Sequence, residues 1–130
     1  MAKTVATIMG IIFIIAGLVG FVWRDPFGAH FSAAHNVIHL VSGAVSLYLG
    51  LKGSLSAAKT FGLIFGIVYL LLGVVGFLLG NPDKMRELTL IDNRLVFGTT
   101  DHIVHILFGA IYLIGALLTK GSPDVVADAT

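Results

Sequence analysis

The chain has 130 residues, of which 57% are hydrophobic, with a mean hydropathy of +0.99 and a formal net charge of +1. This composition excludes an ordinary soluble domain, because apolar runs at this density indicate transmembrane helices. The absence of cysteine excludes disulfides and thiolate metal sites, and no run of Lys or Arg favours nucleic acid.

Four apolar segments are long enough to cross a bilayer, which takes about 20 mostly apolar residues per helix. In chain order they run roughly over Thr4–Trp23, Ala33–Leu51, Thr60–Gly80 and Thr100–Thr119. Ser32 is a candidate N-cap for the second segment, and Thr99 or Thr100 for the fourth. We therefore predict an all-α fold, a four-transmembrane-helix bundle that leaves no room for a soluble catalytic domain.

The connectors differ in length and charge. The Lys52–Lys59 connector is short and polar, so it forces the second and third segments to run antiparallel. The Asn81–Thr99 connector contains LTLIDNRLVFG, a partly apolar stretch that either lies on the membrane surface or folds over the bundle. Near the segment ends, the side of the short connector carries only lysines, whereas acids and bases mix on the other side. Short, acid-free connectors favour the cytoplasm, so we expect both termini to be cytoplasmic.

The third segment repeats the first, and the fourth repeats the second. Lys59 opens a near copy of the run that starts 56 residues earlier, and the run around His39 recurs 66 residues later around His105. We therefore divide the single membrane domain into a first two-helix repeat, residues 1–57, and a second, residues 58–130. Repeats of two helices share one orientation, so a pseudo-two-fold axis along the membrane normal should relate these parallel repeats.

Glycines recur at fixed places in the predicted helices, where small residues let helices approach closely in lipid. They are Gly10, Gly17, Gly20 and Gly43 in the first repeat and Gly66, Gly73, Gly76 and Gly109 in the second. We interpret them as helix-packing residues within one bundle. The alternative is that one of these glycine faces forms a homo-oligomer interface.

Each repeat carries one histidine inside an apolar segment, His39 in the first and His105 in the second. At about 1.5 Å per residue, His39 lies roughly 9 Å below the start of its segment. An ionisable group at that depth is expected to face the bundle interior, where it is a functional candidate. Polar residues three or four positions earlier form the mouth of the candidate site: His35, Asn36, Asp101 and His102.

Four interpretations of this cluster stay open. Its four histidines and Asp101 fit a transition-metal site for Zn, Cu, Ni or Fe, with Asn36 as polar support. His39 and His105 on facing helices also fit a b-type haem. Histidine titrates near neutral pH, so proton handling is a third hypothesis. In the fourth, structural interpretation, the histidines hydrogen-bond each other, Asn36 or a helix carbonyl.

The sequence offers little support for an enzyme. No acid lies deep inside a segment, and no serine stands in a recognised nucleophile motif, so Ser42 and Ser46 are interpreted as helix-packing residues. We expect a non-enzymatic membrane protein that contacts the lipid bilayer and pairs with a second copy or another membrane protein. A structural or accessory subunit, with its histidines serving helix packing, is the alternative to a metal- or haem-binding protein.

The segments around His39 and His105 resemble a known family. NVIHLVSGAVSL, from Asn36 to Leu47, carries the pattern Asn-x-x-His-x-x-x-Gly of the small four-helix bacterial membrane proteins called domain of unknown function 4383. HIVHILFGAIYL is similar to a second occurrence of that pattern, with His102 in place of Asn. The resemblance implies a four-span fold in the inner (plasma) membrane of a prokaryote, and it implies no activity.

Overall fold

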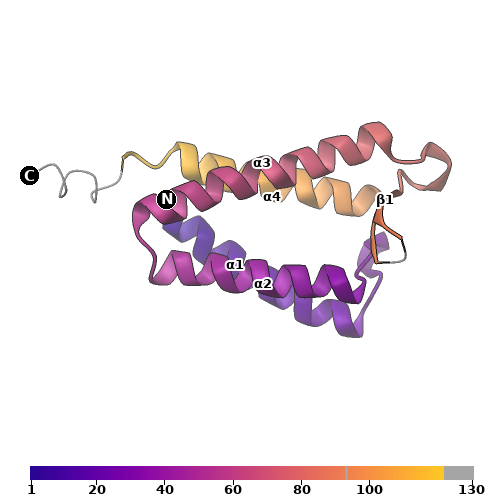
Figure 1. The fold of residues 1–130 in the computed structure, drawn as a ribbon, viewed down its shortest axis with the longest axis horizontal. Coiled ribbons are helices and arrows are strands. Elements are labelled where there is room, and N and C mark those ends of the chain that lie inside the picture. Colours follow the sequence, from indigo (N-terminus) through magenta and orange to yellow (C-terminus); the bar gives the residue numbers. More distant parts are fainter. Residues whose placement is uncertain (93, 122–130) are drawn as a thin grey trace, which may run out of the picture.

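A computed structural model gives the structure of residues 1–92 and 94–121 (Figure 1). The helices are α1 (Ala2–Val22), α2 (Ala33–Leu51), α3 (Leu55–Leu79) and α4 (Thr99–Leu117). The connectors hold two 3₁₀ turns, η1 (Pro26–Gly28) and η2 (Pro82–Lys84), and two strands, β1 (Leu88–Ile91) and β2 (Leu95–Phe97). All four α-helices are long and apolar enough to cross a membrane, so the predicted four-transmembrane-helix bundle is confirmed.

Serine side chains begin two of the helices. Ser32 Oγ accepts a hydrogen bond of 3.2 Å from the backbone N–H of His35, which confirms Ser32 as the N-cap of α2. Ser54 caps α3 in the same way, with a bond of 3.1 Å to the N–H three residues on. Because this cap lies inside the short connector, α3 begins at Leu55 rather than at the predicted Thr60.

The predicted N-cap of α4 was wrong. Gly98 holds that position, and its N–H donates to the carboxylate of Asp101 at 2.9 Å. Thr99 is the first residue of the helix, and its hydroxyl donates instead to the carbonyl of Met85 at 2.7 Å. Asp101 thus accepts the bond from the N–H of the N-cap residue, as the third helical residue does in a capping box, and its charge is also favourable at the positive end of the helix dipole.

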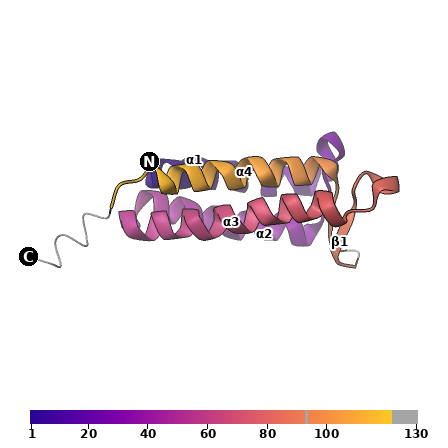
Figure 2. The same ribbon diagram turned by 90° about the horizontal axis from the view of Figure 1, so that it is seen from above.

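The helices form two antiparallel pairs, α1 with α2 and α3 with α4, which lie side by side with their longer connectors at the same end (Figures 1 and 2). Glycines allow the close approach within each pair. A Cβ on Gly10 would lie 2.9 Å from the carbonyl oxygen of Gly43, and a Cβ on Gly66 would lie 3.0 Å from that of Gly109. A larger residue at these positions would push the two backbones apart, which matters in lipid because close packing drives helix association there.

The other predicted packing glycines lie in the same two interfaces, and all eight are buried. A Cβ on Gly17 would lie 2.9 Å from the carbonyl oxygen of Asn36, and one on Gly73 would lie 2.6 Å from that of His102. Gly20 and Gly76 face the side chains of the same two residues. The glycine contacts of the first pair therefore recur in the second pair. The corresponding residues are 56 positions apart in α1 and α3 and 66 positions apart in α2 and α4.

The division into two repeats stays a prediction. Its boundary, between residues 57 and 58, falls inside the first turn of α3, one helix turn later than the end of the connector. Residues 93 and 122–130 of the second repeat lie outside the described residues.

Buried side chains fill the space between the two pairs. The core cluster consists of Met9, Phe13, Tyr69 and Tyr112. The Ser46 hydroxyl donates to the carbonyl of Ala6 at 2.8 Å and lies 2.8 Å from the Tyr112 hydroxyl. Since serine has a single hydroxyl proton, Tyr112 must be the donor to Ser46. This bond joins α2 to α4 in the middle of the bundle.

Large apolar side chains cover the outward faces of the helices. Ile8, Ile64 and Ile114 are 53%, 58% and 55% exposed, and they come from α1, α3 and α4. An apolar surface of this extent is typical of the lipid-facing surface of a membrane protein, where acyl chains rather than water surround the side chains. The bundle therefore contacts a lipid bilayer along its length.

The connector between α3 and α4 contains a β-hairpin, which the all-α prediction lacked. β1 pairs antiparallel with β2, with Leu88 opposite Phe97 and a register irregularity near Ile91. Short alternating runs of β-branched and apolar residues, LTLI and LVF, favour strands over a helix. The sequence left open whether this stretch lies on the membrane surface or folds over the bundle. The structure shows that it folds over the bundle, because Phe97 is 5% exposed and packs over the bundle's end.

Candidate binding site

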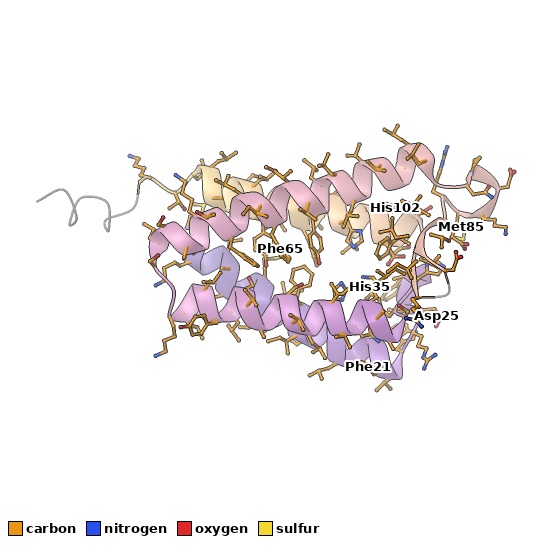
Figure 3. All side chains as sticks on the ribbon, in the orientation of Figure 1. Phe21, Asp25, His35, Phe65, Met85 and His102 are labelled. Carbon is orange, nitrogen blue, oxygen red and sulfur yellow. The ribbon has the colours of Figure 1, made fainter. Side chains whose placement is uncertain are left out.

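Three imidazoles lie near one another in the bundle: His35 and His39 of α2 and His105 of α4. Figure 3 labels the first of them, His35, between the two helix pairs. The ring centroids of His35 and His39 are 4.3 Å apart, and those of His35 and His105 are 6.1 Å apart. The three residues are only 3%, 6% and 4% exposed. A spacing of four residues places His35 and His39 on one face of α2, and that face is turned toward α4. We call these three side chains the histidine cluster.

Aromatic rings surround the histidine cluster. The His39 ring packs against Phe13 with centroids 5.3 Å apart. The His105 ring packs edge to face against Tyr69 at 5.2 Å and against Phe97 at 4.9 Å. Rings from α1, α3 and β2 thus hold the imidazoles in place and keep most of the surroundings apolar.

A cavity of about 140 Å³ lies among these rings. Its polar lining consists of His35, His39, Tyr69, Asp101 and His105. A cavity of this size holds a few water molecules, a hydrated ion or a benzene-sized molecule. Sites for larger cofactors occupy about 300–1,000 Å³. The b-type haem that the sequence suggested therefore does not fit this cavity.

Several imidazole nitrogens in the cluster have no hydrogen-bond partner. His35 Nδ1 lies 2.8 Å from the carbonyl oxygen of His30, and a carbonyl can only accept, so Nδ1 carries the proton. The neutral ring then presents an unprotonated Nε2, which is buried and unpartnered among the described residues. Nδ1 of His39 and Nδ1 of His105 are also buried, and no described residue bonds either nitrogen. An unsatisfied buried polar group costs about 1–3 kcal/mol, so three such groups around one cavity indicate a polar guest.

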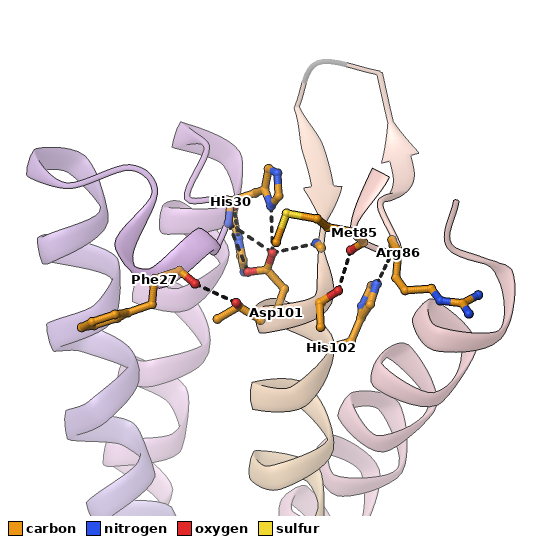
Figure 4. A network of polar contacts seen from close by, with 10 residues as sticks. Phe27, His30, Met85, Arg86, Asp101 and His102 are labelled. Atoms are coloured by element: carbon orange, nitrogen blue, oxygen red, sulfur yellow. Dashed lines mark hydrogen bonds and ion pairs between the residues drawn. The ribbon is translucent and has the colours of Figure 1, made fainter. Parts of the chain in front are cut away.

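Asp101 links the cavity to the surface through His30 (Figure 4). Its carboxylate accepts bonds from the backbone N–H of His30 at 3.1 Å, from the imidazole Nδ1 of His30 at 3.1 Å and from the N–H of Gly98 at 2.9 Å. The Asp101 side chain is 2% exposed, whereas that of His30 is 42% exposed. Three donors already satisfy this carboxylate, so its main task is to fix the α1–α2 connector to the start of α4.

The structure separates His102 and Asn36 from the histidine cluster. The His102 imidazole lies against Gly76 inside the α3–α4 pair, and its Nε2 donates to the carbonyl of Arg86 at 2.7 Å (Figure 4). Asn36 lies against Gly20 inside the α1–α2 pair. The six residues expected at one site therefore split into a cavity group, with Asp101 at its edge, and two side chains that pack within the helix pairs.

No metal-ligating group is already assembled in residues 1–92 and 94–121: no three His, Asp or Glu side chains there converge on one point. The histidine cluster still has the chemistry of a metal site, because imidazole is a good ligand for Zn, Cu, Ni and Fe. His35 has a further feature of metal ligands, since its second ring nitrogen donates to a backbone carbonyl. Ring rotation within the cavity would be needed to bring the nitrogens together.

Sequence reasoning missed two contributors to the site. His30 was not among the candidate residues, but it bonds both Asp101 and His35 across 71 and five residues of sequence. No pattern in the sequence could have shown the first of these contacts. Tyr69 could have been found, because it lies three residues after Gly66 and four before Gly73, on the face of α3 that the glycines turn inward.

A comparison with family models finds one family, described as Domain of unknown function (DUF4383), whose model matches residues 3–118. No curated protein and no solved structure matches the chain. The matched range contains α1 from its second residue on, the other three helices, both long connectors and every residue of the histidine cluster.

Proposed function

This chain belongs to the family Domain of unknown function (DUF4383), and from that premise we propose that it is a non-enzymatic membrane protein that binds one transition-metal ion through His35, His39 and His105. The family description names no activity, so the proposal depends on the site alone. The observation that carries it is the set of three unpartnered imidazole nitrogens around one cavity.

Metal binding would satisfy these nitrogens together. A Zn²⁺ ion takes imidazole nitrogens at about 2.0–2.1 Å in a tetrahedral arrangement, and three histidines leave the fourth position for a water. His35 already presents an unprotonated nitrogen, and the carbonyl of His30 orients its ring. His39 and His105 have no side-chain hydrogen bond among the described residues that would resist rotation toward the ion.

The structural alternative explains a different pair of residues. His102 and Asn36 have packing partners within their helix pairs, and a packing role accounts for both. Among the described residues, Asn36 Oδ1 and His102 Nδ1 are also buried without a hydrogen-bond partner, but they lie against Gly20 and Gly76 inside the helix pairs. The unpaired nitrogens of the histidine cluster belong instead to residues that line one cavity. We therefore assign helix packing to His102 and Asn36, and ligand binding to the three histidines at the cavity.

The proposal also covers the localisation of the protein and its orientation in the membrane. We place the chain in the inner membrane of a prokaryote, with both termini and the Lys52–Lys59 connector on the cytoplasmic side. The histidine cluster then faces the outer side. A reporter fused into the short connector should be active in the cytoplasm, and activity on the opposite side would overturn this orientation.

Metal titration of purified protein tests the binding site. Protein stripped with a chelator and dialysed should take up one equivalent of Zn²⁺ or Co²⁺, and bound Co²⁺ should show the visible absorption of a tetrahedral nitrogen site. Replacement of His35, His39 or His105 by Ala should each weaken binding by about 100-fold or more, since even the outer partners of metal ligands contribute about 10–100-fold. The double change His39→Ala with His105→Ala should add little, because the ligands act as one unit.

His102→Ala is the matched control. It removes a buried imidazole at the same end of the bundle but outside the cavity, so metal uptake should persist. Loss of uptake in this variant, or no stoichiometric uptake in the unaltered protein, would overturn the proposal. A Soret band that appears on titration with haem and depends on His39 and His105 would favour haem over a metal ion.

A further inference from the structure

An apolar groove opens on the side of the bundle between α2 and α3, under the β-hairpin. It occupies about 210 Å³, and its apolar walls include Ile38 of α2, Val68 and Leu72 of α3, and Leu90 of β1. A neighbouring hollow of about 270 Å³ shares Val68, Leu72 and Leu90 with it. The two hollows therefore form one continuous groove along α3, and we call it the lateral groove.

The lateral groove is apolar along its length and polar at its inner end. No Lys, Arg, Asp or Glu lines either hollow. At the inner end stand His35, Tyr69 and His105, each at most 5% exposed, and these three also line the cavity of the histidine cluster. The groove thus connects the lipid-facing side of the bundle with buried polar groups.

Those polar groups have free hydrogen-bonding capacity. Among the described residues, His35 Nε2 and His105 Nδ1 have no hydrogen-bond partner, and Tyr69 brings a hydroxyl to the lining of the groove. A neutral imidazole nitrogen without a proton accepts a hydrogen bond, and a phenol donates one. A guest at this end of the groove must therefore both donate and accept.

We propose that the lateral groove binds a single hydrocarbon chain with an uncharged hydroxyl head group. The chain lies along Val68, Leu72 and Leu90, and the hydroxyl lies between His35 Nε2 and the Tyr69 hydroxyl. A hydroxyl donates to the first and accepts from the second. A charged head group is excluded by the walls, because nothing in them would compensate an ion removed from water.

Selectivity in this site comes from the head group. Lipid tails are as apolar as the groove, so the chain gains little by leaving the bilayer, and the two hydrogen bonds decide the preference. One such bond in a membrane contributes about 0.6–2 kcal/mol, so we expect about tenfold preference for a hydroxyl over a head group that cannot donate.

Photolabelling in nanodiscs tests this proposal. The protein, freed of metal by a chelator, is reconstituted in phosphatidylcholine and exposed to a sixteen-carbon alcohol that carries a diazirine in its chain. We expect saturable labelling of peptides that contain Leu72 and Leu90. Hexadecanol should compete about tenfold better than its methyl ether, which cannot donate, and better than palmitate, which is charged.

Two variants fill the groove from different walls, Leu72→Trp in α3 and Leu90→Trp in the hairpin. Each should lower the labelling at least fivefold. Leu18→Trp is the matched control, because Leu18 is 58% exposed on α1 and lines neither hollow. Tyr69→Phe should weaken competition by the alcohol and by the methyl ether alike, because it removes the bond that both oxygens accept, while the chain still labels the groove.

The outcomes separate this proposal from metal binding. His39→Ala should lose metal and keep the alcohol, since His39 lines the cavity but not the groove. Labelling spread evenly over the lipid-facing helices, or unchanged in both groove-filling variants, would overturn the lateral groove as a site. Equal competition by alcohol, methyl ether and palmitate would overturn the hydroxyl head group.

Discussion

The two helix pairs are alike where their backbones meet and different where their connectors begin. In both pairs, glycines at corresponding positions bring a helix against the carbonyls of its partner. At the connector end, His35 of α2 corresponds to Asp101 of α4, and Asn36 corresponds to His102. The residue types differ between the pairs at these two positions, whereas the glycines are the same in both pairs. The packing positions thus set the shape of the bundle, and the polar positions are free to form a site.

The difference in chemistry gives each pair a separate task at the site. His35 turns an unpaired nitrogen toward the cavity, whereas Asp101 ties the start of α4 to the opposite connector. His39 and His105 keep the same residue type in both pairs, and both line the cavity. The repeats have the same residue at one position, His39 and His105, and different residues at the other, His35 and Asp101. Three imidazoles rather than four therefore meet at the site.

The largest effect should come from breaking the shared packing. Gly17→Leu and Gly73→Leu each drive a side chain into a carbonyl of the facing helix, so each should destabilise the bundle by about 3 kcal/mol or more. Unfolding in mixed micelles measures the loss, with Leu18→Ile as a lipid-facing control. If one glycine variant melts like the unaltered protein, the two interfaces are not equivalent.

Removal of the Asp101 carboxylate should have the next largest effect, confined to one end. Asp101→Ala leaves the N–H groups of His30 and Gly98 without an acceptor, and hydrogen bonds to charged groups contribute about 1.5–3 kcal/mol each. Hydrogen exchange should rise in residues 26–31 and at the start of α4. Protection in the Lys52–Lys59 connector serves as the internal control, and equal deprotection there would argue against a local role.

Substitution of His102 or Asn36, which pack within the helix pairs, should have a smaller effect on stability. His102→Asn makes the second pair resemble the first, and it loses the bond to the carbonyl of Arg86, which we expect to cost about 1 kcal/mol. The reverse change, Asn36→His, should cost more, because a larger ring must fit against Gly20. Melting of both variants measures the difference, and a stabilised Asn36→His variant would show that the first pair has spare room.

The smallest effect should come from the bond that joins the two pairs. Tyr112→Phe and Ser46→Ala each remove the 2.8 Å contact between the hydroxyls. Hydrogen bonds between membrane helices couple by about 0.6 kcal/mol on average, so a double-mutant cycle should yield a coupling of about that size. A coupling near zero would mean that aromatic packing alone holds the pairs together.

The helices were predictable because their signals are local. Twenty apolar residues in a row leave a bilayer span as the main choice, and the bounds of α2 match the prediction at both ends. The hairpin was harder to predict, because LTLI and LVF are short runs whose strands depend on each other and on the bundle beneath Phe97. The N-cap of α4 was predicted wrongly because Gly98, rather than either threonine, holds that position, and its N–H donates to Asp101.

The candidate site was predictable only in part. Equal repeat positions brought His39 and His105 to one cavity, and helical spacing added His35. The same spacing failed for His102 and Asn36, because a rotation of about 100° per residue moves the next position to another face. His30 needed the fold itself, since its partner Asp101 lies 71 residues away.

The aromatic core beneath the cavity has a consequence for exchange with the two sides of the membrane. Met9, Phe13 and Tyr112 are each at most 2% exposed, and they fill the bundle below the imidazoles. Packed side chains therefore separate a solute held by the histidine cluster from the compartment opposite the connectors. Entry and exit would take place at the connector end or through the lateral groove, so the bundle would act as a closed-ended binding site rather than as a pore.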